Sequence, residues 1–149
     1  MRRSAPLLAA VLVVVGGAIH LQLWSSGYQG IPFIGPWFLA NAAVSALLGT
    51  AVVLRPAAGI TFAGIAFSLA SLVAVVLSRT VGLLGFLERR WTDQAFAAVA
   101  AEVGAIVALA VVAVVTGRGT GRTAVAVPGP AQRNGRPGLA GVRQPVSAA

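Results

Sequence analysis

The stretch that decides the fold is QAFAAVAAEVGAIVALAVVAVVT, residues 94–116, in which Glu102 is the one charged side chain. At about 1.5 Å of rise per residue, a helix of this length crosses the roughly 30 Å hydrocarbon core of a bilayer. Hydrocarbon offers no partner to a backbone amide, so each amide must be paired within its own segment. The stretch therefore predicts a transmembrane helix.

Three more apolar runs of similar length precede it, at residues 6–24, 36–54 and 58–78. Hydrophobic residues make up 58% of the chain and charged residues 9%, whereas a soluble domain carries about 25% charged residues. The sequence thus predicts an all-α fold, a polytopic transmembrane four-helix bundle in residues 1–116, with the lipid bilayer as its surroundings.

The first run also permits a second interpretation, a cleaved signal peptide. MRRSAPLLAAVLVVVGGA joins a basic start to an apolar stretch and small residues, as signal peptides do. The apolar run nevertheless continues to Trp24 and is long enough to span a membrane. Its length favours a retained helix.

The arginines predict the orientation of the bundle. Of the eleven basic residues, only Arg79, Arg89 and Arg90 fall on the side opposite the N-terminus, and Glu88 and Asp93 accompany them. Basic loops are retained on the cytoplasmic side of a membrane. We therefore expect a multi-pass protein of the cell inner (plasma) membrane with both termini in the cytoplasm.

Two segments lie outside the long runs. Residues 80–90, TVGLLGFLERR, are apolar but too short to span, so we expect them to lie in the outer interface or to dip back between the helices. Residues 117–149 are rich in Gly, Pro and Arg and contain no acid, which predicts a disordered, basic cytoplasmic tail drawn to anionic lipid. The arginines of this tail are sparse and have no aromatic residue between them, so no nucleic-acid partner is expected.

Three of the predicted helices each place a strongly polar side chain in the outer half of the bilayer. By helical rise, His20 lies about 6 Å below the outer end of its helix, Asn41 about 7.5 Å and Glu102 about 12 Å. Together with Glu88 in the outer loop, they form the predicted ligand-binding set. Two interpretations stay open: a ligand- or proton-binding site open to the outside, or a buried clamp between Glu102 and His20 that fixes the register of two helices.

The chain lacks the patterns on which most catalytic and cofactor sites depend. It has no cysteine and one histidine, and it contains no nucleophile motif, phosphate-binding glycine loop or metal-ligand spacing. We therefore predict no enzymatic activity, no catalytic residue, no cofactor and no metal site.

The stretch HLQLWSSGYQGIPFIGPWFLANA, followed by GLLGFLE and by a Glu in the last helix, resembles a family of small bacterial four-helix integral membrane proteins. The pattern covers about residues 20–102. The resemblance implies the fold and the membrane location, but no mechanism, because the family has no assigned activity. Its recurring positions correspond here to His20, Leu23, Trp24, Gly27, Tyr28, Ile31, Pro32, Gly35, Gly85, Glu88 and Glu102.

Two functions fit these observations. The first is a binding or transport-accessory membrane protein that responds to a small ligand or to protons at a polar site near the outer face. The second is a structural subunit that docks another membrane protein, or a second copy of itself, and has no ligand of its own. The second function would use faces of small residues, which let membrane helices approach closely. Such residues recur at helical spacing at Gly64, Ser68, Ser71, Ala97, Ala101 and Ala105.

Overall fold

Four helices dominate the computed structural model, which describes residues 4–120 of the chain. They are α1 (Ser4–Ser25), α2 (Ile34–Leu54), α3 (Ala58–Thr80) and α4 (Asp93–Thr120), and a short 3-10 turn, η1 (Tyr28–Gly30), lies between the first two. No β-strand forms in the described residues beyond one isolated bridge. The predicted all-α four-helix bundle is confirmed.

All four helices are long and apolar enough to cross a membrane. Their outward faces carry large apolar side chains, among them Leu47, Leu54 and Phe62, each more than 60% exposed. A soluble protein rarely exposes apolar surface on this scale, whereas lipid covers it without cost. These are the features of a multi-pass membrane protein.

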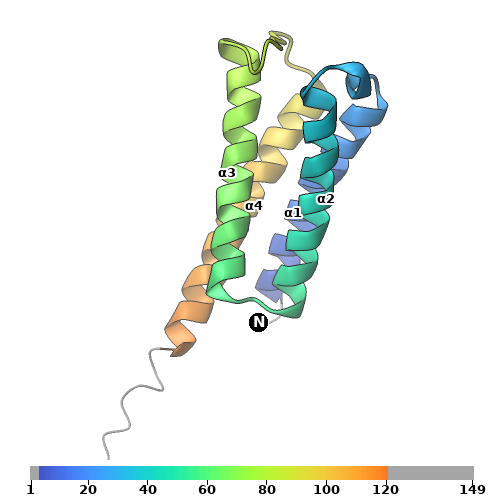
Figure 1. Cartoon of the computed structure of the whole chain (residues 1–149). Coiled ribbons are helices and arrows are strands. Elements are labelled where there is room, and N and C mark those ends of the chain that lie inside the picture. Colours follow the sequence, from blue (N-terminus) through green and yellow to red (C-terminus); the bar gives the residue numbers. More distant parts are fainter. Residues whose placement is uncertain (1–3, 121–149) are drawn as a thin grey trace, which may run out of the picture.

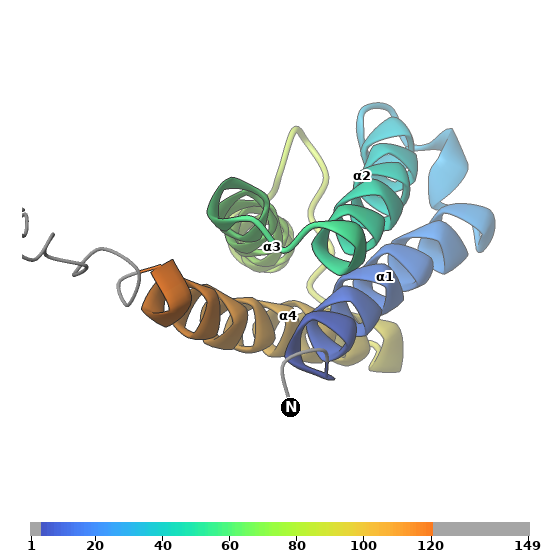
Figure 2. The same ribbon diagram turned by 90° about the horizontal axis from the view of Figure 1, so that it is seen from below.

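Consecutive helices run in opposite directions, so the α1–α2 and α3–α4 connections lie at the same end of the bundle (Figure 1). One end, called here the loop end, carries residues 26–33 and 81–92. The opposite end, the terminal end, carries Ser4, the link at residues 55–57 and Thr120. Seen from the terminal end, the four helices form a ring in the order α1, α2, α3 and α4 (Figure 2). In this ring α1 packs on α2 and α4, and α3 packs on α4, but α2 and α3 make few contacts.

The helix bounds differ from the predicted ones mainly at the end of the chain. Helix α4 extends to Thr120, so residues 117–120 of the predicted tail are helical, and residues 121–149 lie outside the described part. No proline follows until Pro128, and the Thr116 hydroxyl donates to the carbonyls of Val112 and Ala113. No proline therefore interrupts the helix at the edge of its apolar run.

The hydrophobic core lies toward the terminal end. Its buried members come from α1, α2 and α4, namely Ala9, Ala10, Val13, Val52, Ala105, Ala108, Leu109 and Val112. Because α1 supplies three of these residues, a chain without this helix would leave α2 and α4 with an uncovered face. The helix is thus an integral part of the bundle.

Small residues bring the helix axes together. A Cβ on Gly17 would lie 2.5 Å from Ser45 Cβ of α2, and a Cβ on Gly64 would lie 2.9 Å from Leu109 Cδ1 of α4. Both distances are shorter than a normal carbon contact. Ser45 Cβ is fixed to the α2 backbone, so Gly17 requires glycine, whereas a larger residue at Gly64 would force the end of the Leu109 side chain to move. The small-residue faces of α3 and α4 are largely used inside the chain: Gly64, Ser68, Ser71, Ala101 and Ala105 are buried, and Ala97 is exposed.

Candidate functional site: a cavity between α2 and α3

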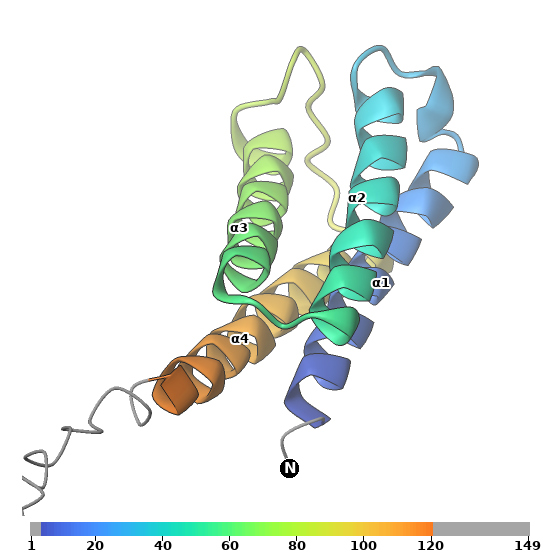
Figure 3. The same ribbon diagram turned by 60° about the horizontal axis from the view of Figure 1, so that its bottom comes forward.

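A cavity of about 500 Å³ occupies the loop end of the bundle, where α2 and α3 stand apart (Figure 3). Side chains from all four helices and from both loops form its walls, and most of them are apolar. The polar side chains in the walls are His20, Tyr28, Asn41, Ser71, Ser78 and Arg79. The volume falls within the roughly 300–1,000 Å³ of small-molecule sites.

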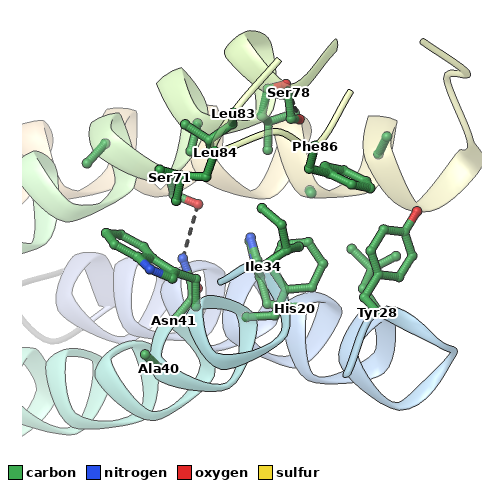
Figure 4. A pocket seen from close by; sticks show the side chains of 18 of the residues that line it. His20, Tyr28, Ile34, Ala40, Asn41, Ser71, Ser78, Leu83, Leu84 and Phe86 are labelled. Atoms are coloured by element: carbon green, nitrogen blue, oxygen red, sulfur yellow. Dashed lines mark hydrogen bonds between the residues drawn. The ribbon is translucent and has the colours of Figure 1, made fainter. Parts of the chain in front are cut away.

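The cavity exists because small residues face it from three helices. Ala40 on α2, Ala70 and Ala74 on α3, and Ala95 and Ala98 on α4 all line the space without filling it. One hydrogen bond between side chains crosses the gap from α2 to α3, from Asn41 Nδ2 to Ser71 Oγ at 3.2 Å (Figure 4). Asn41 is held in turn by Ser45, whose hydroxyl donates to Asn41 Oδ1 at 3.3 Å.

His20 reaches the cavity from α1 (Figure 4) and is only 4% exposed. Its Nδ1 lies 2.8 Å from the carbonyl oxygen of Gly16, one helical turn earlier. A carbonyl only accepts hydrogen bonds, so Nδ1 carries a proton and donates it. In the neutral ring Nε2 then holds the lone pair, and in the described residues Nε2 has no hydrogen-bond partner. The ring meets Phe38 edge-on at a centroid distance of 5.3 Å.

A polar network closes the loop end of the cavity and is called here the cap. It consists of Tyr28, Arg79 and Glu88. The Tyr28 hydroxyl donates to Glu88 Oε2 at 2.9 Å, and Glu88 Oε1 lies 3.9 Å from Arg79 Nη1. Arg79 also donates to the backbone carbonyls of Glu88 and Arg90 and lies over the ring of Trp91. The cap therefore ties the α1–α2 connection to the α3–α4 connection.

The environment of the cap raises the pKa of Tyr28 above its ordinary value of 10.0. Burial of the hydroxyl is the largest cause, and the hydrogen bond to Glu88 and the negative charge of this carboxylate add to it. The positive charge of Arg79 acts in the opposite direction. Each of the first three effects favours the protonated phenol, which is the form that can donate to Glu88.

The loop at residues 81–92 forms one wall of the cavity. It turns sharply through Gly82, Leu84 and Gly85, all of which have positive φ angles (93°, 50° and 82°). Backbone hydrogen bonds of 2.8 Å in both directions join Leu83 and Phe86, and both side chains line the cavity (Figure 4). The loop thus packs against the helices that border the cavity.

Glu102 lies on α4 outside the cavity lining, one turn beyond Ala98, and is 3% exposed. A Cβ on Gly16 of α1 would lie 3.4 Å from its Oε1. One turn toward the loop end, Ala98 lines the cavity, and one turn in the other direction, Ala105 belongs to the core. In the described residues no hydrogen bond or ion pair joins Glu102 to His20, although both approach Gly16.

The four predicted ligand-binding residues thus occupy three levels. His20 and Asn41 line the cavity, Glu88 lies in the cap, and Glu102 lies outside the lining, one helical turn from Ala98 toward the terminal end. Four further lining residues were not predicted from the sequence, namely Arg79, Tyr28, Ser71 and Ser78. Ser71 and Ser78 are seven residues apart and thus share one face of α3, a spacing from which their common orientation could have been predicted.

The cavity offers few groups for a metal or a cofactor. Within residues 4–120, no three His, Cys, Asp or Glu side chains lie close enough together to hold a metal ion. The cavity walls contribute a single imidazole and no carboxylate. The lining is suited to an organic molecule with a small polar group.

Comparisons of the chain with protein-family models, with curated proteins and with solved structures find no match. The geometry of the cavity therefore carries the functional argument.

Proposed function

We infer that this is a plasma-membrane protein that binds a small amphipathic ligand in the cavity between α2 and α3. The observation that carries this proposal is a cavity of about 500 Å³ with apolar walls, into which an imidazole points. The arginine distribution favours cytoplasmic termini. In that orientation the cavity lies in the outer half of the bilayer and its cap near the outer surface.

The lining groups favour binding over catalysis. Ser78 donates its hydroxyl proton to the carbonyl of Val75, and Ser71 Oγ accepts from Asn41. Neither hydroxyl is bonded to His20, so no base lies in position to activate a nucleophile. A site with one unpaired imidazole nitrogen and apolar walls can hold and orient a molecule without transforming it.

The shape of the cavity favours a ligand that comes from the membrane. Several lining residues on its α2 and α3 edges are exposed on the bundle surface, namely Trp37, Ala40, Val44 and Ala70. The cavity therefore opens sideways, between two helices that a bilayer surrounds. An apolar space that opens to hydrocarbon takes up apolar groups rather than water, which fits the tail of an amphipathic molecule.

Blocking the side opening tests this function. Ala70→Phe places a large ring in the opening, and Ala63→Phe places the same ring on an exposed position of α3 outside the cavity. After purification in mild detergent, mass spectrometry should find a bound small molecule on the wild-type protein and on Ala63→Phe, and at least tenfold less on Ala70→Phe. Equal amounts on both variants would contradict the proposal. Recovery of a stoichiometric protein partner with no bound small molecule would favour the structural subunit instead.

A further inference from the structure

Most polar groups of the cavity already have hydrogen-bond partners, but one nitrogen of His20 does not. The Nε of Arg79 has no partner either, but this atom is buried within the cap. Asn41 is bonded to Ser45 and Ser71, and the Tyr28 hydroxyl is bonded to Glu88. His20 uses Nδ1 for the Gly16 carbonyl, and its Nε2 has no partner in the described residues. Because the His20 side chain is almost fully buried, the cavity is the space from which a partner can reach Nε2.

The charges around the cavity select a neutral partner. Arg79 is the one charged side chain in the described walls. Its guanidinium is accompanied by the Glu88 carboxylate and donates to two backbone carbonyls. An anionic ligand would have to compete with Glu88 for Arg79, and a cationic ligand would find no carboxylate in the walls. An anionic head group would thus lose its hydration for a share of Arg79, and a cationic head group would lose it without gaining any counter-charge.

Aromatic rings divide the cavity into a region for the polar head group of a ligand and a region for its apolar tail. Phe38 packs against both His20 and Tyr28, and Phe86 packs against Tyr28, with centroid distances of 5.3–5.9 Å. The rings form a chain at the loop end, in which Phe38 contacts the imidazole directly. Ala40 and Ala70 line the cavity and are also exposed on the bundle surface, so a tail would pass into the bilayer along this edge between α2 and α3.

We propose that the cavity binds a neutral membrane amphiphile with a hydroxyl group, which donates a hydrogen bond to His20 Nε2 while the apolar tail passes out between α2 and α3. This inference rests on the proposed binding function and adds the chemical class of the ligand. A hydroxyl is the smallest uncharged group that supplies the donor that Nε2 requires. An ether or an ester alone cannot supply it, because both only accept.

Photolabelling with matched competitors tests the head group. The wild-type protein in lipid nanodiscs is labelled with hexadecanol that carries a diazirine in mid-chain, and the labelled residues are mapped by mass spectrometry. The competitors are hexadecanol, hexadecyl methyl ether and palmitate, which share a tail and differ in the head. Labelling should fall on cavity residues of α2 and α3, and hexadecanol should compete about fivefold better than the ether, as expected for one hydrogen bond to a neutral group.

His20→Phe supplies the matched variant, because a phenyl ring keeps the edge contact with Phe38 and removes Nε2. In this variant the alcohol and the ether should compete equally. Cavity labelling in which the ether equals the alcohol on the wild-type protein, or in which palmitate competes best, would overturn the hydroxyl assignment and leave the binding function intact. Labelling that avoids the cavity, or that Ala70→Phe does not reduce, would overturn the binding function itself. The wild-type comparison decides the head group even if His20→Phe does not fold.

Discussion

At the terminal end of the bundle, alanine, valine and leucine side chains fill the space between three helices, and Leu109 and Val52 are fully buried. At the loop end, alanines face a cavity instead, and the two loops and the polar side chains of the cap close it. Small residues thus have opposite effects at the two ends. Where a larger side chain from a neighbouring helix meets them, they permit close packing, and where none does, they leave a space. The contrast indicates that the terminal end holds the bundle together and the loop end is available for a ligand.

The largest expected effect is a difference in cysteine labelling between the two ends, because they lie on opposite sides of the membrane. Ser26 at the loop end and Ala58 at the terminal end are both exposed, and the chain has no native cysteine. An impermeant thiol reagent on intact cells should label Ser26→Cys and leave Ala58→Cys unlabelled until the membrane is opened. The reverse pattern would place the cavity in the cytoplasmic half.

The same truncation should have unequal effects at the two ends. Leu109 is fully buried in the core, so Leu109→Ala should lower the free energy of unfolding in detergent by about 2–5 kcal/mol, as core Leu→Ala changes do. Leu23 lines the cavity and already lacks neighbours on one side, so Leu23→Ala should lower it by less than about 1 kcal/mol. Equal losses would show that the loop end is packed as tightly as the terminal end.

A smaller effect is expected from the cap. Glu88→Gln removes the counter-charge of Arg79, whose side chain is 9% exposed, and should lower the free energy of unfolding by about 1–2 kcal/mol. Asp93→Asn changes the net charge by the same amount, at an exposed position with no ion pair in the described residues. It should change the free energy of unfolding by less than about 0.5 kcal/mol. Thermal unfolding of the two variants measures the difference. Equal shifts would mean that Arg79 does not depend on Glu88.

The smallest effect is a shift in the titration of Tyr28, which is the one tyrosine in the chain. Tyrosinate absorbance should report a pKa above 10.0 in the folded protein, and Glu88→Gln should move it part of the way back, because burial remains. A raised pKa means that the folded protein holds the proton more tightly than the unfolded chain. The stabilisation from Tyr28 should therefore be complete below about pH 10 and be lost as the pH rises through the folded pKa. An unshifted pKa in the folded protein would contradict the Tyr28–Glu88 bond.

The sequence predicts the helices well because their cause is local. Each apolar run matches the thickness of a bilayer, and a lipid environment allows no other spanning structure for such a run. The depth of His20, Asn41 and Glu102 likewise follows from helical rise, so their approximate levels were predictable.

The cavity was not predictable, because it depends on how segments that are far apart in the sequence are arranged in space. It depends on how far α2 stands from α3, and on a loop in which Leu84 adopts a positive φ angle that few non-glycine residues accept. The clamp between His20 and Glu102, one of the two interpretations of the sequence, did not consider the backbone as a partner: His20 donates Nδ1–H to the carbonyl of Gly16, within its own helix. A side chain can satisfy itself locally in this way, and spacing along the sequence does not show it.

The most direct test of the central claim compares buried alanines at the two ends. Ala95 and Ala98 line the cavity, Ala9 and Ala105 lie in the core, and all four are at most 2% exposed. With methyl-labelled alanine in lipid nanodiscs, nuclear Overhauser effects report which methyl groups lie beside alkyl chains, and exposed Ala70 serves as the positive control. We predict effects from alkyl protons to Ala95 and Ala98 and none to Ala9 and Ala105. Effects at Ala70 alone would show that the space between α2 and α3 takes up no alkyl chain, and would contradict the account.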